Sequence, residues 1–577
     1  MVTATPSKHA LSTRRADFAT VPEAIAYAAR GETGLNFYSG KGELTESLTY
    51  ARLYDEALPL ARRMLAKGLV KGDRVAIIAE SDGDFMRAFA ACQFAGLVPA
   101  PMPLPAAFGG KDAYIDHIRR MIQGADAAAA LSPAALADWL CAAADGLGLK
   151  AVGTLAVFDG VEAGNIALPV VTPDDLCYLQ FSSGSTRFPL GVAVTQRALM
   201  ANAHAITHHG LGITGNDRCV SWLPLYHDMG LVGFLLTPLV CQVSIDYLPT
   251  REFARRPLLW LSLISRNGGT LSYSPSFGYE LAARRAETAS TEGIDLSTWR
   301  GAGIGGDMVR PRVLRKFAET FAPRGFRAEA LVPSYGMAEA SLALSFAPLD
   351  TGLVTDLVDL DRLENDAVAE RPGAGTVRSR EFVLNGPVLP GHALQVRDPD
   401  GDVLGERQVG RLFARGPSLM REYFNRPEET AAVLSPDGWL DTGDLGYLCD
   451  GQIVITGRAK DLILVNGRNI WPQDLEWSAE HAVEQLRSGD VVAFSVDGEG
   501  GEQVLVLVQC RPTQADARAA LATQVQGVLR AAHGLEVKVV LVPTHSLPQT
   551  SSGKLSRTKA RQMYLAGAFG PDATVAA

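Results

Sequence analysis

Residues 179–194 read LQFSSGSTRFPLGVAV, and this stretch determines the expected fold class. The apolar run 175–181 breaks abruptly into small and hydroxylated residues: Ser182, Ser183, Gly184, Ser185 and Thr186. Small residues let backbone N–H groups converge on an anion, and the hydroxyl groups add further donors. The pattern predicts a strand followed by a phosphate-binding loop. It is not the GxxxxGK[ST] loop of Walker-type proteins, and a plain Ser/Gly-rich turn explains this segment equally well.

Strands and helices are expected to alternate in the chain before this loop. A β-branched run at 75–79 is followed by a helical pattern at 85–95, and 127–132 reads as another strand. Such alternation favours βαβ units and a parallel sheet. The proline-rich stretch 99–105 is expected to be a loop, because proline fixes φ.

The second half of the chain has a different texture from about Phe382 onwards. Short strand-like runs at 394–396, 409–414 and 452–456 predict a β-rich lobe. Further strands and helices are expected at 462–465, after Pro472, and at 491–495, 504–510, 516–533 and 537–542. We therefore predict an α/β protein with a large N-terminal domain, residues 1–457, of two αβ sub-units and a β-rich lobe. A small, mobile α/β C-terminal domain would span 458–577. The charged segment 351–380 is expected to be an insertion or a long surface loop.

Composition excludes several classes of protein. The chain has 577 residues, too many for one core, and a net charge of −9 without a basic stripe, which argues against nucleic acid as a partner. Its seven cysteines form no CxxC pair, so neither a disulfide framework nor a zinc site is expected. A reducing cytoplasm is the expected location. The first ten residues lack the apolar core of a signal peptide. The longest apolar run, about 230–241, is too short to span a membrane.

Four further motifs follow the phosphate loop in order. They are SYGMAEASL at 334–342, DTGDLG at 441–446, GRAKDLILVNGRNIWPQDLE at 457–476 and LPQTSSGKLSR at 547–557. Together with the loop, they resemble the ANL superfamily of adenylate-forming enzymes over essentially the whole chain. Leu190 stands where most members have Lys, and Ala338 where most have Thr. These departures, with SWLPLYHDMGLVG at 221–233 and SYSPSFGYELAARR at 272–285, resemble the fatty acyl-AMP ligases.

That resemblance implies a reaction and its partners. ATP and Mg²⁺ would activate a fatty acid to an acyl-adenylate, releasing pyrophosphate. The acyl group would then pass to an acyl carrier protein, or to a carrier domain of a polyketide or peptide synthase, on a separate chain. In this branch the insertion, here 351–380, is implicated in preventing acyl-CoA formation. Two alternatives stay open: an acyl-CoA synthetase, and a non-catalytic nucleotide- or acyl-binding protein of the same fold.

The resemblance also assigns roles to single residues. Lys554 would be the essential lysine, bridging the carboxylate and the α-phosphate as two anions approach; otherwise it is a solvated lysine. Glu339 would bind Mg²⁺, a hard cation that prefers oxygen ligands. Tyr335, followed by Gly336, would stack on adenine unless it is a core aromatic residue. The final assignments are a ribose-contacting pair, Asp444 and Arg458, and a hinge pivot, Lys460.

Three other groups complete the expected site. His227 would lie near the α-phosphate and the acyl carboxylate; a catalytic dyad with Asp228 is doubtful, because adjacent residues on a strand point oppositely. Residues 301–306, GAGIGG, match GxGxxG literally, but no apolar strand precedes them, so the dinucleotide context fails. Gly305 and Gly306 instead resemble the adenine-binding loop of the family. The expected acyl pocket, with plain core as its alternative, includes Trp222, Phe234, Tyr273 and Phe277.

Overall fold

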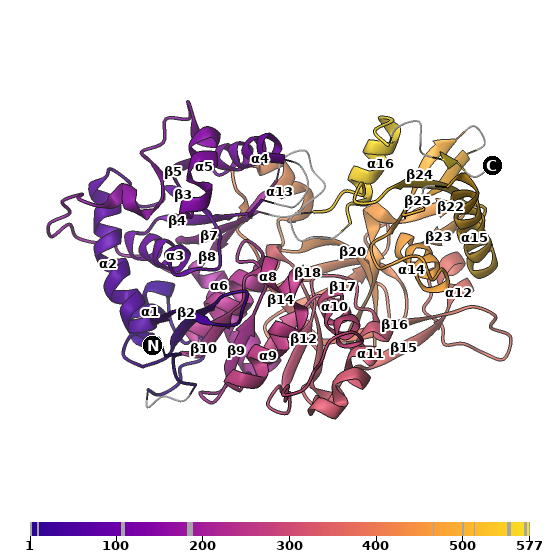
Figure 1. Cartoon of the computed structure of the whole chain (residues 1–577), viewed down its shortest axis with the longest axis horizontal. Coiled ribbons are helices and arrows are strands. Elements are labelled where there is room, and N and C mark those ends of the chain that lie inside the picture. Colours follow the sequence, from indigo (N-terminus) through magenta and orange to yellow (C-terminus); the bar gives the residue numbers. More distant parts are fainter. Residues whose placement is uncertain are drawn as a thin grey trace.

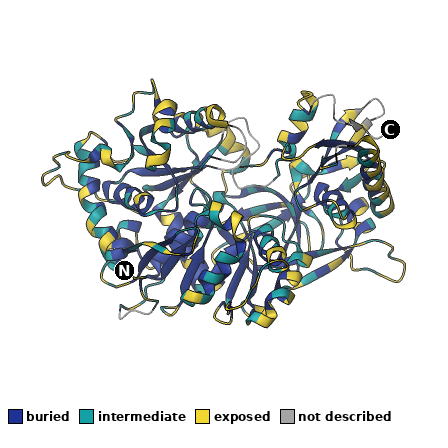
Figure 2. Ribbon diagram, viewed as in Figure 1, coloured by how far each residue is buried: buried dark blue, intermediate teal, exposed yellow. Residues whose placement is uncertain are grey.

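The computed structural model describes residues 3–7, 11–105, 110–181, 189–465, 467–498, 501–512, 514–550, 555–569 and 574–575. The predicted phosphate loop, Ser182–Thr186, and the predicted catalytic Lys554 lie outside these ranges. Figure 1 shows an elongated molecule, with the first third of the chain at one end and the C-terminal elements at the other. Figure 2 shows that the strands form the buried interior of both ends.

The first αβ unit confirms the predicted alternation. Its parallel sheet has the strand order β4-β3-β5-β6, with bounds Val98–Met102, Arg74–Ile78, Ala127–Leu131 and Ala151–Gly153. The connecting helices are α3 (Gly83–Ala95), α4 (Gly110–Gly124) and α5 (Ala137–Ala144). Helix α3 begins where the Asp82 side chain accepts a hydrogen bond from Phe85 N, and ends at Gly96 with φ +64°, the left-handed conformation that suits glycine.

The predicted loop at 99–105 is wrong for its first part, because 98–102 form strand β4. Pro99 and Pro101 pair with Val75 and Ile77 of β3, and β4 is the end strand of its sheet. Alternate N–H groups of an end strand point away from the ladder, so prolines two residues apart remove no ladder hydrogen bond. The position of the strand in the sheet therefore overrides the local proline signal.

An eight-stranded sheet forms the centre of the molecule. Its order is β14-β13-β12-β11-β9-β10-β1-β2, and its pairs are parallel except at the two ends, β13–β14 and β1–β2. The strands are β1 (Gly34–Tyr38), β2 (Leu44–Thr49), β9 (Arg218–Ser221), β10 (Ser244–Tyr247), β11 (Leu271–Ser274), β12 (Gly301–Ile304), β13 (Leu331–Gly336) and β14 (Ala343–Phe346). The helices α8 (Thr250–Arg255), α9 (Pro257–Asn267), α10 (Ser276–Ala286) and α11 (Pro311–Phe321) connect them.

The stretch quoted first belongs to a small antiparallel sheet. Strand β7 (Leu176–Phe181) pairs with β8 (Gly191–Thr195), and β8 pairs with β19 (Glu422–Tyr423). The strand predicted at 175–181 is confirmed. The chain therefore enters and leaves the predicted phosphate loop through two paired strands.

A six-stranded antiparallel sheet forms the β-rich lobe. Its order is β15-β16-β21-β20-β18-β17, with bounds Thr355–Asp359, Ser379–Pro387, Gln452–Arg458, Leu440–Cys449, Gly410–Arg415 and Ala393–Arg397. The prediction of a long surface loop at 351–380 is therefore wrong. The segment contains β15, helix α12 (Leu360–Asp366) and the start of β16. Val358, Leu360 and Leu363 are buried. Few apolar residues suffice here because the intervening charges pair with one another, as between Arg378 and Glu364 at 2.7 Å.

The C-terminal elements have hydrophobic cores of their own. Strands β24 (Val491–Gly498), β25 (Gly501–Cys510), β26 (Lys538–Pro543) and β27 (Thr574–Val575) form one sheet, and β22 (Ile463–Val465) pairs with β23 (Arg468–Ile470). In β25, Val504, Val506 and Val508 enter the core beneath α14 (Pro472–Ala482) and α15 (Ala515–His533), whereas Leu505 and Leu507 enter the one beside α16 (Arg557–Leu565). This alternation is the period of two expected for a strand buried on both faces. No helix in the ranges given above is both long and apolar enough to cross a membrane.

Candidate functional site

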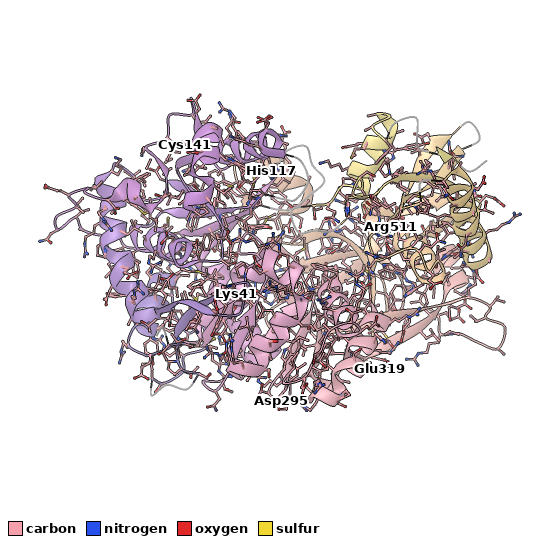
Figure 3. The ribbon with its side chains drawn as sticks, in the orientation of Figure 1. Lys41, His117, Cys141, Asp295, Glu319 and Arg511 are labelled. Atoms are coloured by element: carbon pink, nitrogen blue, oxygen red, sulfur yellow. The ribbon has the colours of Figure 1, made fainter. Side chains whose placement is uncertain are left out.

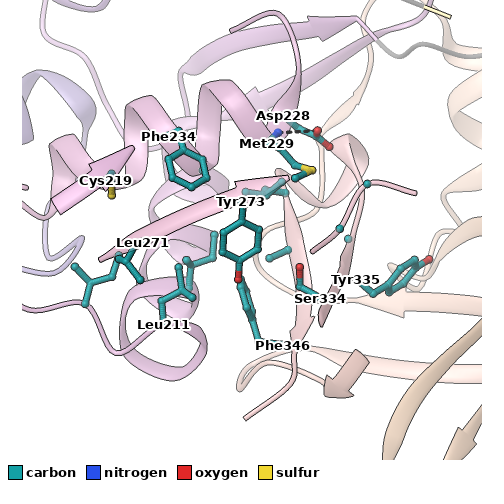
Figure 4. A pocket seen from close by; sticks show the side chains of 18 residues that line it. Leu211, Cys219, Asp228, Met229, Phe234, Leu271, Tyr273, Ser334, Tyr335 and Phe346 are labelled. Carbon is teal, nitrogen blue, oxygen red and sulfur yellow. Dashed lines mark hydrogen bonds between the residues drawn. The ribbon is translucent and has the colours of Figure 1, made fainter. Parts of the chain in front are cut away.

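A narrow pocket lies between the central sheet and the segment 228–236. At one end it is lined by polar and glycine residues, at the other by apolar side chains, with Phe234 and Tyr273 between (Figure 4). The first end comprises Asp228, Gly305, Gly306, Ser334, Tyr335 and Gly336, and the second comprises Ile206, Leu211, Ile213, Cys219 and Leu271. The pocket thus brings together two predicted groups of residues. Gly305, Gly306, Tyr335 and Gly336 were expected at the nucleotide, and Phe234 and Tyr273 were expected at the acyl chain.

The glycines of β12 make room for one wall of this pocket. Tyr273 of β11 pairs in register with Gly303, and a Cβ on Gly303 would lie 1.8 Å from the tyrosine ring. A Cβ on Gly301 would lie 2.7 Å from Leu271 Cδ2. The GxGxxG match therefore has a packing explanation: glycines let the side chains of β11 lie across β12 and line the pocket.

Tyr335, Asp444 and Arg458 lie together, as expected. Tyr335 Oη donates to Asp444 Oδ2 at 2.8 Å, and Arg458 Nε lies 3.5 Å from Asp444 Oδ1. The pairing of β20 with β21 sets Asp444 opposite Arg458. Burial, followed by the charge of Asp444, raises the pKa of Tyr335 well above its usual value. Asp444 likewise raises the pKa of Arg458. The hydroxyl of Tyr335 is thus held at the carboxylate, with one edge of its ring at the pocket.

Glu339 has a partner that sequence reasoning missed. Tyr423 Oη, from β19, donates to Glu339 Oε1 at 2.8 Å. Burial raises the pKa of Glu339, and the Tyr423 hydrogen bond opposes that shift. The two residues are 84 positions apart, and no local pattern marks Tyr423. Because β19 pairs with β8, this hydrogen bond links Glu339 to the strand that follows the predicted phosphate loop.

His227 lies in a bend and not on a strand. It precedes the π-helix η4 (Met229–Leu236), whose N-cap residue is Asp228, and its own N–H donates to Pro224 O at 3.1 Å. The strand-based argument against a pairing with Asp228 is therefore wrong, although the role of His227 stays a prediction. Asp228 itself lines the pocket, and sequence reasoning did not place it there.

Two of the four residues expected in the acyl pocket are absent from its described lining. Phe234 and Tyr273 line the pocket, but Trp222 and Phe277 do not. The Trp222 ring stacks on Phe253 with centroids 3.8 Å apart and meets Phe277 edge-on at 5.7 Å. These ring contacts favour the core interpretation for Trp222, which is buried, while Phe277 is partly buried against the same core.

The predicted hinge lies in the short 3₁₀ turn η8 (Ala459–Asp461), between β21 and β22. Desolvation, followed by the charge of Arg458, lowers the pKa of Lys460. The next residue, Asp461, accepts from Arg557 Nη1 at 2.8 Å, and Arg557 also donates to both carboxylate oxygens of Glu476, at 2.8 and 2.7 Å. Arg557 begins α16, three positions after Lys554. Sequence reasoning quoted Arg557 within its motif but gave it no role. Its ion pairs hold the start of α16 to η8 and α14.

The segment 351–380 contacts the C-terminal elements through buried charges. Glu364, 2% exposed, lies 2.5 Å from Arg468 of β23, and Arg380 Nη1 lies 2.7 Å from Asp474 Oδ2 of α14. Burial raises the pKa of Asp474 to about 7, although Arg380 opposes the shift. Buried ion pairs cost desolvation energy and are specific in their geometry. They favour one placement of the C-terminal elements on the rest of the molecule.

Comparison with known proteins identifies an enzyme family. The AMP-binding enzyme family matches residues 20–424. A protein of Caulobacter vibrioides (strain NA1000 / CB15N), whose name assigns it provisionally to the acyl-CoA synthetases, is 57% identical over 98% of this chain and 99% of its own. The medium-chain fatty acid–acyl-carrier-protein ligase JamA of Moorena producens (strain JHB) is 31% identical over 96% of each chain.

A solved structure is similar over almost the whole chain. It comes from a study of fatty acyl-adenylate ligases from E. coli and L. pneumophila, and it matches with a TM-score of 0.92 and 42% identity. The match covers 96% of this chain and 99% of that one. It confirms the predicted α/β class with a large N-terminal part.

Proposed function

This chain belongs to the AMP-binding enzyme family, and from that membership we propose that it activates a fatty acid for a carrier protein. It is an ATP-dependent, AMP-forming ligase. Our proposal adds the substrate, a fatty acid, and the acceptor, the phosphopantetheine thiol of a separate acyl carrier protein or carrier domain. It also takes residues 1–457 as the domain that holds the substrates and 458–577 as a mobile lid. The seven free cysteines are consistent with a cytoplasmic location.

The pocket is the observation that carries this proposal. Gly305, Gly306 and Tyr335 line one end, and Leu211, Cys219 and Leu271 line the other. An apolar wall stabilises an alkyl chain by about 0.8 kcal/mol for each buried CH₂ group. An acyl carboxylate at the polar end would therefore reach the nucleotide, while its chain is held away from water.

The proposed first step is in-line attack at phosphorus. A carboxylate oxygen attacks the α-phosphorus of ATP, and the bond from that phosphorus to the bridging oxygen of pyrophosphate breaks. Lys554 would offset the repulsion between the two anions, and His227 would lie beside them. Residues Ser182 to Thr186 would hold the phosphates. Tyr335, Gly336 and the Gly305–Gly306 turn would hold adenine, and Asp444 with Arg458 would hold the ribose.

Glu339 is the residue proposed to hold Mg²⁺. Within the described ranges, no group of three or more His, Cys, Asp or Glu side chains suits a metal. A single carboxylate fits Mg²⁺, which is bound in such sites by substrate phosphates and water together with one or two carboxylates. Since burial raises the pKa of Glu339, a cation beside it would favour the ionised form. The bound ion would neutralise charge on the polyphosphate.

The proposed second step transfers the acyl group to sulfur. The pantetheine thiol loses its proton, its sulfur attacks the acyl carbon, and AMP leaves with the oxygen to which that carbon was bound. The choice of carrier over CoA would rest on the ion pairs from Glu364 to Arg468 and from Arg380 to Asp474. They would hold the lid in the placement used for adenylation and would bias it against the rotation that CoA needs.

Product analysis tests this proposal. With ATP and a panel of fatty acids, we expect pyrophosphate release that rises with chain length to a limit, and acyl-carrier but little acyl-CoA product by mass spectrometry. Equal kcat/KM for acetate and a longer acid would contradict the acyl pocket. The name of the Caulobacter relative favours a second candidate, an acyl-CoA synthetase; equal transfer to CoA and carrier would favour it. Binding without any pyrophosphate release would favour a non-catalytic protein.

A further inference from the structure

A compact group of basic side chains lies on the outer surface of helix α8. Arg251 and Arg255 are 70% and 72% exposed and lie four positions apart, on one side of the helix. The exposed Arg256 donates from Nη1 to Gly40 O at 2.7 Å, which brings the exposed Lys41 beside the end of α8. Figure 3 labels Lys41 in the central region where Figure 1 labels α8. We call Lys41, Arg251, Arg255 and Arg256 the α8 basic face.

The one carboxylate of α8 is turned inward. Glu252 is 18% exposed and faces Gly40, where a Cβ would lie 2.2 Å from its Oε2. It lies 3.7 Å from Arg251 and 3.5 Å from Arg255, so two guanidinium groups share one half-buried acid. Like charges at i and i+4 destabilise a helix slightly. Glu43, exposed in the loop 39–43, is a second acid beside this face. Four basic side chains therefore stand against two carboxylates, and the surface is positive on a chain whose net charge is −9.

The inner side of α8 is fixed to the segment that leads into the pocket. Thr250 Oγ1 donates to Trp222 O at 2.7 Å, and the Phe253 ring stacks on Trp222 at 3.8 Å. The chain runs from Trp222 through His227 to Asp228, which lines the pocket. The inner side of α8 therefore contacts the beginning of the segment that continues to the predicted reacting residues.

We propose that the α8 basic face is a docking surface for an acidic carrier protein. The inference rests on the proposed transfer to a carrier. A negatively charged partner is steered to such a face and oriented on it, and its long, flexible pantetheine arm would then reach the acyl-adenylate. A membrane surface fits less well, because among the described residues none of the large exposed hydrophobic side chains lies in α8 or in the loop 39–43.

Charge reversal with a matched control tests this inference. The variant Arg251→Glu/Arg255→Glu should raise the KM for E. coli holo-acyl carrier protein at least about tenfold and change kcat little, because charges at the edge of an interface act on association. Pyrophosphate release from ATP and a fatty acid should stay unchanged. The control, Arg197→Glu/Arg327→Glu, reverses arginines that are 61% and 50% exposed elsewhere. It should leave the carrier KM unchanged.

Salt provides a second measurement. From about 50 to about 300 mM salt, the carrier KM of the wild type should rise more steeply than that of the α8 variant. An unchanged carrier KM in the α8 variant would overturn the inference. The inference would also be overturned if the wild type acylated free pantetheine but not the carrier. It would be overturned as well if the α8 variant bound phosphatidylglycerol vesicles more weakly than the wild type while its carrier KM stayed normal. Use of CoA as the sole acceptor would instead overturn the carrier step of the proposed function, and this inference with it.

Discussion

At the residue scale, the proposed chemistry depends on one lysine, Lys554, which lies outside the described ranges. Lys554 lies three positions before Arg557, whose guanidinium is fixed by Asp461 and Glu476. A side chain that acts on charge at phosphorus contributes to the barrier and little to the core.

We therefore expect Lys554→Ala to lower pyrophosphate release by much more than about tenfold, which corresponds to roughly 1.4 kcal/mol. Its thermal unfolding midpoint should match the wild type. Lys559→Ala, which removes an exposed lysine from the neighbouring helix α16, is the matched control and should keep full activity. Release within about tenfold of wild type would show that Lys554 is not the essential lysine.

Gly303 makes a second residue-scale prediction. A methyl group there would lie 1.8 Å from the Tyr273 ring, so Gly303→Ala should push the ring into the pocket and cost about 1–3 kcal/mol of unfolding free energy. The kcat/KM for long fatty acids should fall more than that for short ones. Adding Tyr273→Leu should restore part of the loss, because it removes the ring. A uniform loss at every chain length would argue that Tyr273 does not line the acyl site.

At the element scale, β15 and α12 connect the β-rich lobe to the C-terminal elements. Deleting 351–380 would remove the end strand β15 and expose the edge of β16, so it tests stability as much as acceptor choice. Removing one charged side chain at the interface is a more selective test of acceptor choice than deleting the segment. Glu364 has two cationic partners, Arg378 and Arg468, and keeps one when the other is removed.

Arg468→Ala is therefore expected to raise acyl-CoA output without lowering acyl-AMP output. A shift of about 1.4 kcal/mol in the placement of the lid would change the product ratio tenfold. The matched control is Arg362→Ala, on the same helix as Glu364, whose partners Asp366 and Glu370 are both exposed. Continued exclusion of CoA at full adenylation rate would move the cause of acceptor choice away from this ion pair.

At the scale of the whole molecule, a buried carboxyl group on α14, 3.9 Å from Arg310, is expected to make stability pH-dependent. Burial raises the pKa of Glu480 to about 8. The charge of Arg310 opposes this shift, and the charges of Glu476 and Glu280 add to it. The carboxyl of Glu480 also accepts from Gly489 N at 2.6 Å. At pH values between the usual pKa of a glutamate and about 8, the folded protein holds a proton on Glu480 that the unfolded chain has lost. The stability contributed by this group is therefore lost as pH rises.

Glu480→Gln keeps the acceptor and removes the titration. We expect the free energy of unfolding of the wild type to fall, relative to the variant, by about 2–3 kcal/mol between pH 6 and about pH 8.5. Urea unfolding at the two pH values measures this difference. Glu484→Gln, at an exposed position nearby, should behave like the wild type. Parallel pH profiles for the wild type and Glu480→Gln would contradict the prediction.

Much of this protein follows from sequence alone. The α/β class, the strand before the first motif and the β-rich lobe were predictable, because apolar periodicity and turn residues are local signals. The family resemblance assigned Tyr335, Asp444 and Arg458 to one nucleotide, and the structure has them in contact. The roles of these residues, of Glu339 and of Lys460 stay predictions, as do those of Lys554 and Ser182–Thr186, which lie outside the described ranges.

Only the tertiary structure decided the rest. Tyr423 reaches Glu339 across 84 positions, Pro99 and Pro101 fit because β4 is an end strand, and 355–366 fold because their charges pair. Trp222 packs on Phe253 outside the pocket that Tyr273 enters. In each case the decisive neighbour is distant in sequence. A residue's own pattern states what it can bury or bond, whereas which partner it meets depends on how the whole chain packs.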